Sequence, residues 1–319
     1  MEELTLLYYS KVFSIILIFF LFITALYIYK TINKNIIFNQ NPINIKKGEK
    51  IEKIFNKNIN NYSILEIEIA KFYVKINNKI NKSFVHYGDF EIQNNTSLIN
   101  FINTITKPSN ILLKITIVEG WSKKQLEREL SKYFSIYESI PYENIIADTY
   151  FFQKNIDFNT FVKKLYDSKK NYFDNIRNNK LLNNFTENEL MIIGSLIEKE
   201  GLDRLDKKQI SSVIFNRLNN SMKLQIDATV IYAITNGNYD LQRKLLLSDL
   251  KVNHPYNTYT FKGLPPKPIS YVGRKTLDIV FENYETEFLF YFFNKSLNKH
   301  IFSKSYKEHK EKLNDYRNK

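Results

Sequence analysis

The chain has 319 residues, a formal net charge of +13 and 44% hydrophobic residues, so it can form a sizeable core and is predicted to hold two or three domains. It contains no cysteine, which excludes disulfides, thiolate nucleophiles and cysteine-based zinc sites. Basic residues are scattered and interleaved with acidic ones, as in Glu127-Arg128-Glu129. We therefore expect no nucleic-acid partner, and a lysine-rich surface that suits an anionic membrane or polymer.

The strongest local pattern is an uncharged apolar run from Val12 to Tyr29, bounded by Lys11 and Lys30. The run is about long enough to span a hydrocarbon core as a helix. Small residues of a signal-peptidase site do not follow it, because Ala25 is followed only by large apolar and aromatic residues. We predict an uncleaved single-pass anchor at 12–29 after a short tail, 1–11. The flanking charges alone lean toward a cytoplasmic location of the downstream side and do not decide the orientation.

After a predicted linker, 30–42, the residues 43–114 read as a small α+β module. Pro42 and Gly48 punctuate its beginning. The predicted elements are an extended segment Ile43–Lys47, an amphipathic stretch Ile51–Phe55, a helical pattern at Leu98, Phe101 and Ile102, and a strand over Ile111–Val118. Periodicity alone says nothing about a ligand of this module.

A connecting helical region is predicted at 115–182, followed by a mixed α/β catalytic domain at 183–319. Ser122 is a good N-cap for a helix over Lys123–Tyr133, since Gln125 can complete a capping box. A second amphipathic helix is predicted over Phe158–Asn175.

One helix carries the most informative residue. Thr186 and Glu189 form a capping-box pattern, so a helix is predicted from there to Gly201. At about 100° per residue, Glu200 projects near the middle of the apolar arc, whereas Glu198 points away from it. A carboxyl group held against apolar side chains has a raised pKa and can act as a general acid near neutral pH. The alternative is that both glutamates are ordinary surface charges at a solvated helix end.

Polar and aromatic side chains alternate further along the chain in the way a carbohydrate groove uses them. Amides and hydroxyls can bind sugar hydroxyls, and rings can cover the apolar faces of sugars. Each residue also has a structural alternative, because Asn257 and Thr258 can simply form a turn and Asp227 can cap a helix starting near Ala228. The candidate sugar-binding residues are Gln225, Asp227, Tyr256, Asn257, Thr258 and Tyr259.

Taken together, these motifs resemble the YceG-like endolytic murein transglycosylases, which are membrane-anchored enzymes that cleave nascent peptidoglycan strands. The resemblance covers nearly the whole chain. It implies a LysM-like module at 43–114, a domain outside the cytoplasmic membrane, peptidoglycan as substrate, cell-wall synthases as partners and no cofactor. It also places the family's catalytic residue, the second glutamate of a Glu-Lys-Glu motif, at Glu200. The matching segments are Val118–Gly120, Asp148–Tyr150, Ser195–Glu200, Val213–Leu218, Leu224–Gln225 with Asp227, Thr229–Tyr232, Tyr256–Tyr259, Gly263–Pro266, and His300 with Phe302–Ser303.

The sequence departs from the family pattern at several loop positions. Ala147 and Val272 stand where proline is usual, and Lys267 stands where glycine is usual. Ile226 and Ala228 replace a small polar residue and a proline beside the aspartate. None of these changes removes a reactive group, so they bear on loop shape and groove detail.

The resemblance implies a lytic reaction with Glu200 as its one acid, giving a 1,6-anhydro product. Two alternatives from other classes stay open. One is a hydrolytic muramidase that uses Asp227 as the partner carboxylate, and the other is a non-catalytic wall-binding anchor. A Ser195–Lys199 nucleophile is weakly supported because this spacing is common by chance. No metal site is expected, since His86, His254, His300 and His309 lack ligand spacing.

Overall fold

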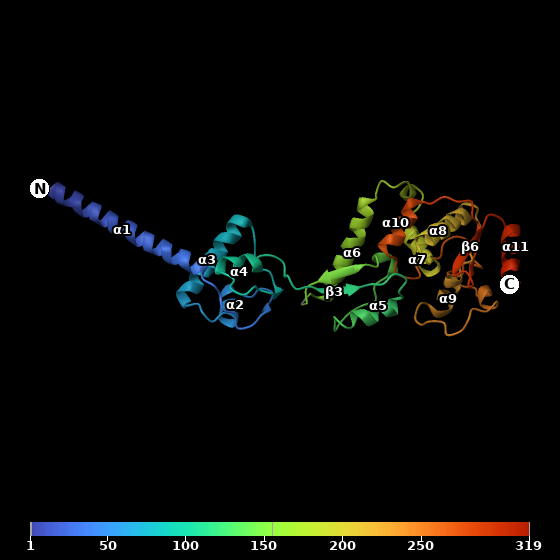
Figure 1. Ribbon diagram of the computed structural model, residues 1–319, viewed down its shortest axis with the longest axis horizontal. Helices are drawn as coiled ribbons and strands as arrows, with labels where there is room; N and C mark the ends of the chain where they lie inside the picture. Colours follow the sequence, from blue (N-terminus) through green and yellow to red (C-terminus); the bar gives the residue numbers. More distant parts are fainter. Residues whose placement is uncertain (1, 155, 319) are drawn as a thin grey trace. The chain divides into compact units, whose positions relative to one another are not determined.

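A computed structural model describes residues 2–154 and 156–318. The chain divides into two compact units (Figure 1). The first unit runs to Leu113 and includes a short segment that begins at Phe152, and the second holds the remaining residues. Apart from that short segment, the predicted connecting region, 115–182, belongs to the same unit as the predicted catalytic domain, 183–319.

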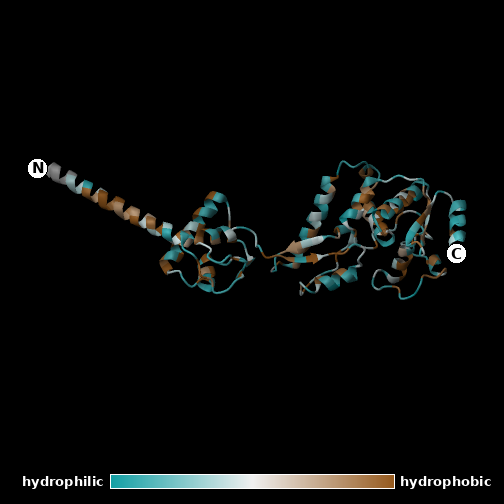
Figure 2. Cartoon of the chain, viewed as in Figure 1, coloured by the Kyte–Doolittle hydropathy of each residue, from teal (hydrophilic) through white to brown (hydrophobic). Residues whose placement is uncertain are grey.

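The N-terminal helix α1 spans Glu2–Asn33. Within the described residues it is the one helix long and apolar enough to cross a membrane, over Tyr8–Asn33. Figure 2 shows the hydrophobic residues that make up the middle of this helix. The predicted span, 12–29, lies inside this helix, and large apolar side chains along it are exposed.

In the first unit, strand β1 (Ile43–Ile45) pairs antiparallel with β2 (Gly88–Phe90), with Ile43 opposite Phe90. Helices α2 (Ile51–Asn58) and α3 (Ile64–Asn81) lie between these strands in the chain, and α4 (Leu98–Ile105) follows them. Buried Phe55, Phe90 and Phe101 contribute to the core. The mixed α+β character is confirmed, helix α3 was not predicted, and the LysM-like assignment stays a prediction.

The segment predicted as a linker, 30–42, packs into this unit. Helix α1 continues to Asn33, and Thr31 and Ile36 are buried. The backbone N–H of Ile36 donates to the carbonyl of Thr96 at 2.9 Å. The Tyr62 hydroxyl lies 2.9 Å from the carbonyl oxygen of Lys34, just past the helix end. The span helix is thus joined to the module by packing and hydrogen bonds, without a free spacer.

The second unit is mainly helical, with two small sheets. One sheet pairs β3 (Leu113–Thr116) with β4 (Thr149–Phe152), and the other is an antiparallel hairpin of β5 (Phe290–Asn294) and β6 (Lys299–Ser303). The predicted helix Phe158–Asn175 is confirmed as α6, and the helix after Ser122 is shorter than predicted. The other helices are α5 (Lys123–Leu130), α7 (Glu187–Glu200), α8 (Arg204–Asn219), α9 (Asp227–Thr235), α10 (Arg274–Glu282) and α11 (Tyr306–Arg317), with 3-10 turns at Tyr142–Asn144, Lys180–Asn183 and Asp249–Lys251.

Helix α7 is the central element of this unit. The predicted capping box is present, because the Thr186 hydroxyl accepts from the N–H of Glu189 and the Glu189 side chain accepts from the N–H of Thr186. Every residue from Leu190 to Ile197 is buried, and α7 contacts both α8 and α10. A Cβ added at Gly194 would come within 2.7 Å of Val272. The small residue thus permits a close approach that fixes the depth of α7 in the core.

Glu198 lies outside the apolar arc, as predicted, but its carboxylate is buried rather than solvated. The side chain is 2% exposed and lies 2.5 Å from the Nζ of Lys207 on α8. It also accepts the backbone N–H of Gly273 at 2.9 Å, and Lys207 in turn donates to Thr276 at 2.9 Å. This ion pair joins the end of α7 to α8 and to the start of α10.

We predict that Glu198→Gln lowers the free energy of unfolding by about 2–4 kcal/mol, because it removes one charge of a buried pair and leaves Lys207 without its counter-charge. Thermal unfolding followed by circular dichroism measures the effect. Glu189→Gln is the matched control, because an amide oxygen can still complete the capping box. Equal melting temperatures for Glu198→Gln and the wild type would contradict the structural role.

Candidate active site

Glu200 is the last residue of α7 and is partly buried. It lines a cavity of about 390 Å³ in the second unit. The other lining residues come from α8, the loop before α9, the first residue of α9, the loop before α10, the β5–β6 hairpin and the first half of α11. They are Arg217, Gln225, Asp227, Tyr259, Phe290, Tyr291, Phe292, Phe293, His300, Tyr306 and His309.

The environment of Glu200 favours the protonated carboxyl group. Burial is the larger cause and the negative charge of Asp227 the smaller, and together they raise the pKa of Glu200 from 4.5 to a net value of about 7. Three weaker influences act in the opposite direction: the charge of His300, a backbone hydrogen bond from Ala228, and the Tyr291 hydroxyl. The Tyr291 hydroxyl lies 3.4 Å from a Glu200 oxygen. Because its pKa is near neutrality, Glu200 can both give and take a proton.

Asp227 is the first residue of α9 and faces the same cavity. The hydroxyl of Tyr259 donates to its Oδ1 at 2.6 Å. This bond and burial raise the pKa of Tyr259, so the phenol stays a hydrogen-bond donor. Tyr259 thus orients the carboxylate of Asp227 beside Glu200, whose carboxyl group resists ionisation. Two carboxyl groups in such different environments can divide the roles of charge stabilisation and proton transfer.

A buried contact between a histidine and a carboxylate supports another part of the cavity lining. The Nδ1 of His300 on β6 lies 2.9 and 3.0 Å from the two carboxylate oxygens of Asp206 on α8, and both side chains are nearly buried. A carboxylate partner keeps the proton on Nδ1. The rings of Tyr291 and His300 meet edge to face, with their centroids 5.3 Å apart. Asp206 therefore fixes His300, and His300 helps to hold the tyrosine that reaches Glu200.

Arg217 ties together the segments that meet at the cavity. Its guanidinium donates to the carbonyls of Leu224 at 2.6 Å and Leu289 at 2.7 Å, and it lies 5.3 Å from the ring centroid of Phe290. Leu224 precedes Gln225, which has a φ of +52°. The loop that carries Gln225 and the hairpin that carries Tyr291 are thus fixed to one buried cation.

The structure brings together only part of the predicted sugar-binding set. Gln225, Asp227 and Tyr259 line the cavity with Glu200. Asn257 is fully buried and its amide donates to the carbonyl of Val252 at 2.7 Å. Thr258 is also buried, and its hydroxyl accepts the backbone N–H of Ile226 at 3.0 Å. These two hold the loop that positions Asp227, as the turn alternative anticipates.

Tyr256 also lies outside the cavity lining. Its ring packs on Tyr232 with centroids 4.6 Å apart, and it stacks on His254. Direct sugar contact by Tyr256, Asn257 and Thr258 is therefore not part of the site proposed below. The sequence does not predict most of the other lining residues. Arg217 and His300 appear there only as motif positions, and the aromatic residues Phe290 to Phe293, Tyr306 and His309 do not appear as site candidates.

Other chemistries find little support in the arrangement. The Ser195 hydroxyl is fully buried and donates to the carbonyl of Ile192 at 2.7 Å. Lys199 is exposed and its Nζ lies 3.4 Å from the carbonyl of Gly120, so the two do not form a nucleophile and base. Among residues 2–154 and 156–318, no group of three or more histidine or acidic side chains is arranged to hold a metal ion.

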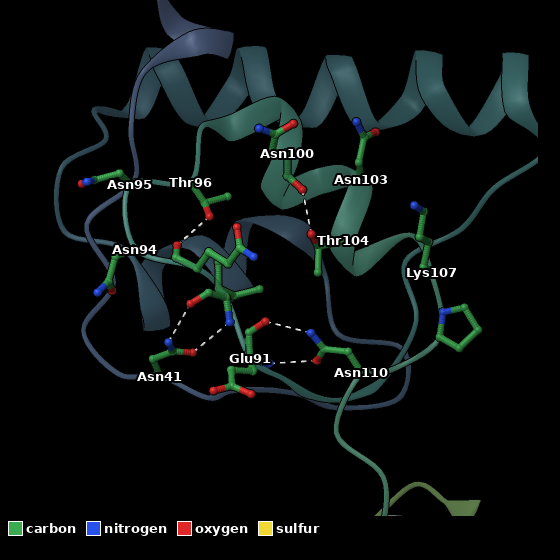
Figure 3. A pocket seen from close by; sticks show the side chains of 13 residues that line it. Asn41, Glu91, Asn94, Asn95, Thr96, Asn100, Asn103, Thr104, Lys107 and Asn110 are labelled. Carbon is green, nitrogen blue, oxygen red and sulfur yellow. Dashed lines mark hydrogen bonds between the residues drawn. The ribbon is translucent and has the colours of Figure 1, made fainter.

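The first unit carries a separate polar cleft of about 1000 Å³ (Figure 3). Two asparagines brace it: Asn41 exchanges hydrogen bonds with the backbone of Ile92, and Asn110 does so with the backbone of Glu91. The amides of four further asparagines are exposed and make no hydrogen bond with the described part of the chain. These four are Asn94, Asn95, Asn100 and Asn103.

Comparison with known proteins places the chain in a family. A model of the YceG-like family matches residues 43–315, so the chain belongs to that family. An endolytic murein transglycosylase of Bacillus subtilis is 27% identical over 310 residues, which cover 86% of this chain and 84% of that protein. One of Streptococcus pneumoniae is 32% identical over 160 residues, 45% of this chain and 28% of that protein. The crystal structure of a yceG-like protein from Listeria monocytogenes superposes with a TM-score of 0.55 at 24% identity, covering 86% of this chain and 99% of that one.

We predict opposite effects of two cavity substitutions on the pKa of Glu200. Asp227→Asn removes a negative charge and should lower that pKa, whereas His300→Gln removes the favourable charge of the imidazole and should raise it. Carbon-13 NMR of the labelled glutamate carboxyl group measures the pKa of Glu200 in each variant, in a titration from about pH 4 to about pH 9. Shifts of the same sign in the two variants would contradict the electrostatic assignment.

The same titration has a consequence for stability. Because the pKa of Glu200 is raised in the folded state, the folded chain binds more protons than the unfolded chain between pH 4.5 and about 7. Stability due to this group therefore falls as the pH rises through that window. Glu200→Gln should be as stable as the wild type at pH 4.5 and more stable above pH 7, by at most about 3 kcal/mol.

Proposed function

We propose that the chain is an endolytic lytic transglycosylase that cleaves peptidoglycan glycan strands between N-acetylmuramic acid and N-acetylglucosamine. The observation that carries the proposal is Glu200, a carboxyl group whose pKa is raised to about 7 inside a cavity lined with polar and aromatic side chains. Family membership supports it, since the relatives from B. subtilis and S. pneumoniae are named endolytic murein transglycosylases.

In the proposed reaction, protonated Glu200 donates its proton to the glycosidic oxygen as the bond to the anomeric carbon breaks. The carboxylate then accepts the proton of the muramoyl 6-hydroxyl, whose oxygen forms the new bond to the anomeric carbon. The proton has moved from one oxygen to the other through Glu200, and water is not consumed. The product carries a 1,6-anhydro end.

The neighbours of Glu200 have defined parts in this mechanism. Asp227, held by Tyr259, provides negative charge beside the developing oxocarbenium ion. Gln225 offers an amide to the sugar hydroxyl or acetamido groups. Tyr291 and His300 position the Glu200 carboxyl group and balance its charge. The aromatic side chains of the hairpin, such as Phe292, cover apolar sugar faces.

Glu200→Gln is the direct test. It keeps the shape of the side chain and removes the transferable proton, and because both steps use this group, the rate should fall by about 10,000-fold or more. Mass spectrometry of products from purified sacculi measures it. Glu198→Gln, assayed per folded molecule, should retain much more activity. Near wild-type cleavage by a folded Glu200→Gln protein would contradict the mechanism.

Product chemistry separates the alternatives from the proposal. A hydrolytic muramidase using Glu200 and Asp227 leaves a reducing end, which has the mass of the anhydro end plus one water. A wall-binding anchor without catalysis gives neither product, and its wall binding does not depend on Glu200. Anhydro ends that depend on Glu200 are expected.

We further propose that α1 is a single-pass anchor in the cytoplasmic membrane and that both units after it lie outside the cytoplasm. The length and hydropathy of α1 support the anchor, and the peptidoglycan substrate requires that side. An enzyme held there meets strands as they are made, so cell-wall synthases are the proposed partners.

The polar cleft of the first unit is proposed to hold glycan without performing chemistry. Uncharged amides match the hydroxyl and acetamido groups of the strand. Asn100→Ala with Asn103→Ala removes two free amides from α4 and should weaken sacculus binding several-fold without changing cleavage of short glycan. Asn56→Ala with Asn60→Ala removes two exposed amides of the same unit outside the cleft and is the matched control. Equal binding by both double variants, measured by sedimentation with sacculi, would contradict a role for the cleft.

A further inference from the structure

Helix α3 presents apolar side chains on two different faces. One face, with Ala70 and Val74, is buried in the core of the first unit. The other face is exposed: Leu65 is 60%, Phe72 63% and Ile80 73% accessible. Together with Ile69 and Ile76 these residues recur at steps of four, three, four and four, which is a single stripe along a helix. Such a continuous exposed stripe marks an interaction surface.

The stripe continues directly into the surface of the proposed membrane span. Ile28 and Ile32 of α1 line one apolar groove of about 330 Å³ with Ile69, Phe72 and Ile76 of α3. Both helices belong to the first unit and contact each other. Glu68 and Tyr73 complete the lining of this groove, and its apolar residues connect the surface of α1 to the stripe of α3.

The depth of this groove matches the edge of the bilayer. The apolar run Val12–Tyr29 is about 27 Å long as a helix, close to the hydrocarbon thickness of about 30 Å. Ile28 and Ile32 lie on either side of Lys30, where the run ends. The groove thus lies at the level where acyl chains meet headgroups, which is where amphipathic helices bind.

Charges next to the stripe fit the same location. Lys71, Lys75 and Lys79 recur every four residues along one flank of it. Lys71 is engaged by Glu68 at 2.8 Å, while the side chains of Lys75 and Lys79 have no ion pair within residues 2–154 and 156–318. Lysines on the flank of an apolar helix face can contact anionic headgroups.

We propose that the exposed face of α3 lies in the headgroup region of the membrane that α1 spans. This inference rests on the proposed anchor and is independent of the proposed chemistry. The module is then held against the bilayer by a span and by a second, surface-bound helix, so that its orientation to the membrane is fixed. The occupant of the stripe is lipid, rather than a second copy of the chain.

Site-directed spin labelling tests the proposal, and the chain suits it because it has no cysteine. Phe72→Cys and Ile80→Cys, each in the full chain in lipid nanodiscs, carry the label on the stripe. Leu247→Cys is the control, since Leu247 is an 83% exposed apolar residue of the second unit. We expect the stripe labels to collide with dissolved oxygen and to be shielded from a water-soluble nickel complex, and the control label to show the reverse.

Each other outcome overturns a distinct claim. A label at Ile18, in the middle of the apolar run, tests the anchor itself. If the Ile18 label is in lipid while the Phe72 and Ile80 labels are as water-accessible as Leu247, the membrane face of α3 is wrong and the anchor stands. Dipolar broadening between the stripe labels of two chains would assign the face to a dimer, which also overturns the proposal.

Discussion

The chemistry of this molecule depends on one constraint: a carboxyl group must stay protonated near neutral pH while it faces a cavity that can admit a polar substrate. Burial alone can raise the pKa of a carboxyl group by up to about 3–5 units, which would make Glu200 a poor proton donor near neutral pH. Burial and the charge of Asp227 raise the pKa of Glu200. The charge of His300, the backbone N–H of Ala228 and the hydroxyl of Tyr291 lower it. The resulting pKa of about 7 lets one group serve as acid and then as base.

This balance requires elements that are far apart in the chain. Glu200 ends α7, Asp227 begins α9, and Tyr291 and His300 come from a hairpin about one hundred residues further on. Arg217 links the Gln225 loop to that hairpin through two backbone carbonyls. Asp206 holds His300 through its Nδ1. In the proposed mechanism, few groups touch the reacting bond, and the buried polar contacts of Arg217 and Asp206 fix the segments that carry those groups.

The sequence predicts part of this arrangement, and the physical reasons for success and failure differ. Helical periodicity directly determines which side chains share a face, so the sequence predicts the direction of Glu200, and the structure has it lining the cavity; its catalytic role stays a proposal. Asn257 and Thr258 are polar residues in the right motif, but a linear pattern cannot tell an amide that faces a cavity from one that caps backbone carbonyls inside a loop. Tyr291 could not be placed, since its approach to Glu200 depends on tertiary packing. The sequence signal at this position is a run of four consecutive aromatic residues, Phe290 to Phe293.

Helix α3 shows a different limit of periodicity. Apolar residues on one face of a helix give a clear 3.6-residue pattern, but α3 has a buried face and an exposed apolar face, so the two patterns overlap and the amphipathic signal is blurred. Once the fold shows that Ala70 and Val74 are buried, the remaining apolar residues of α3 can be assigned to an exposed face.

Two glutamates separated by one residue illustrate how the helix assigns chemistry. Glu198 and Glu200 are about 200° apart around α7, so they enter different environments on opposite sides of the helix. Glu198 meets Lys207 and a backbone N–H and joins three helices as a buried charge. Glu200 has no lysine or arginine ion pair within the described residues and faces Asp227, which keeps its carboxyl group protonated to a higher pH. In the proposed mechanism, the Glu-Lys-Glu motif thus places a structural carboxylate, Glu198, and the proton donor, Glu200, on a single turn, and Glu198 fixes the end of the helix that carries Glu200.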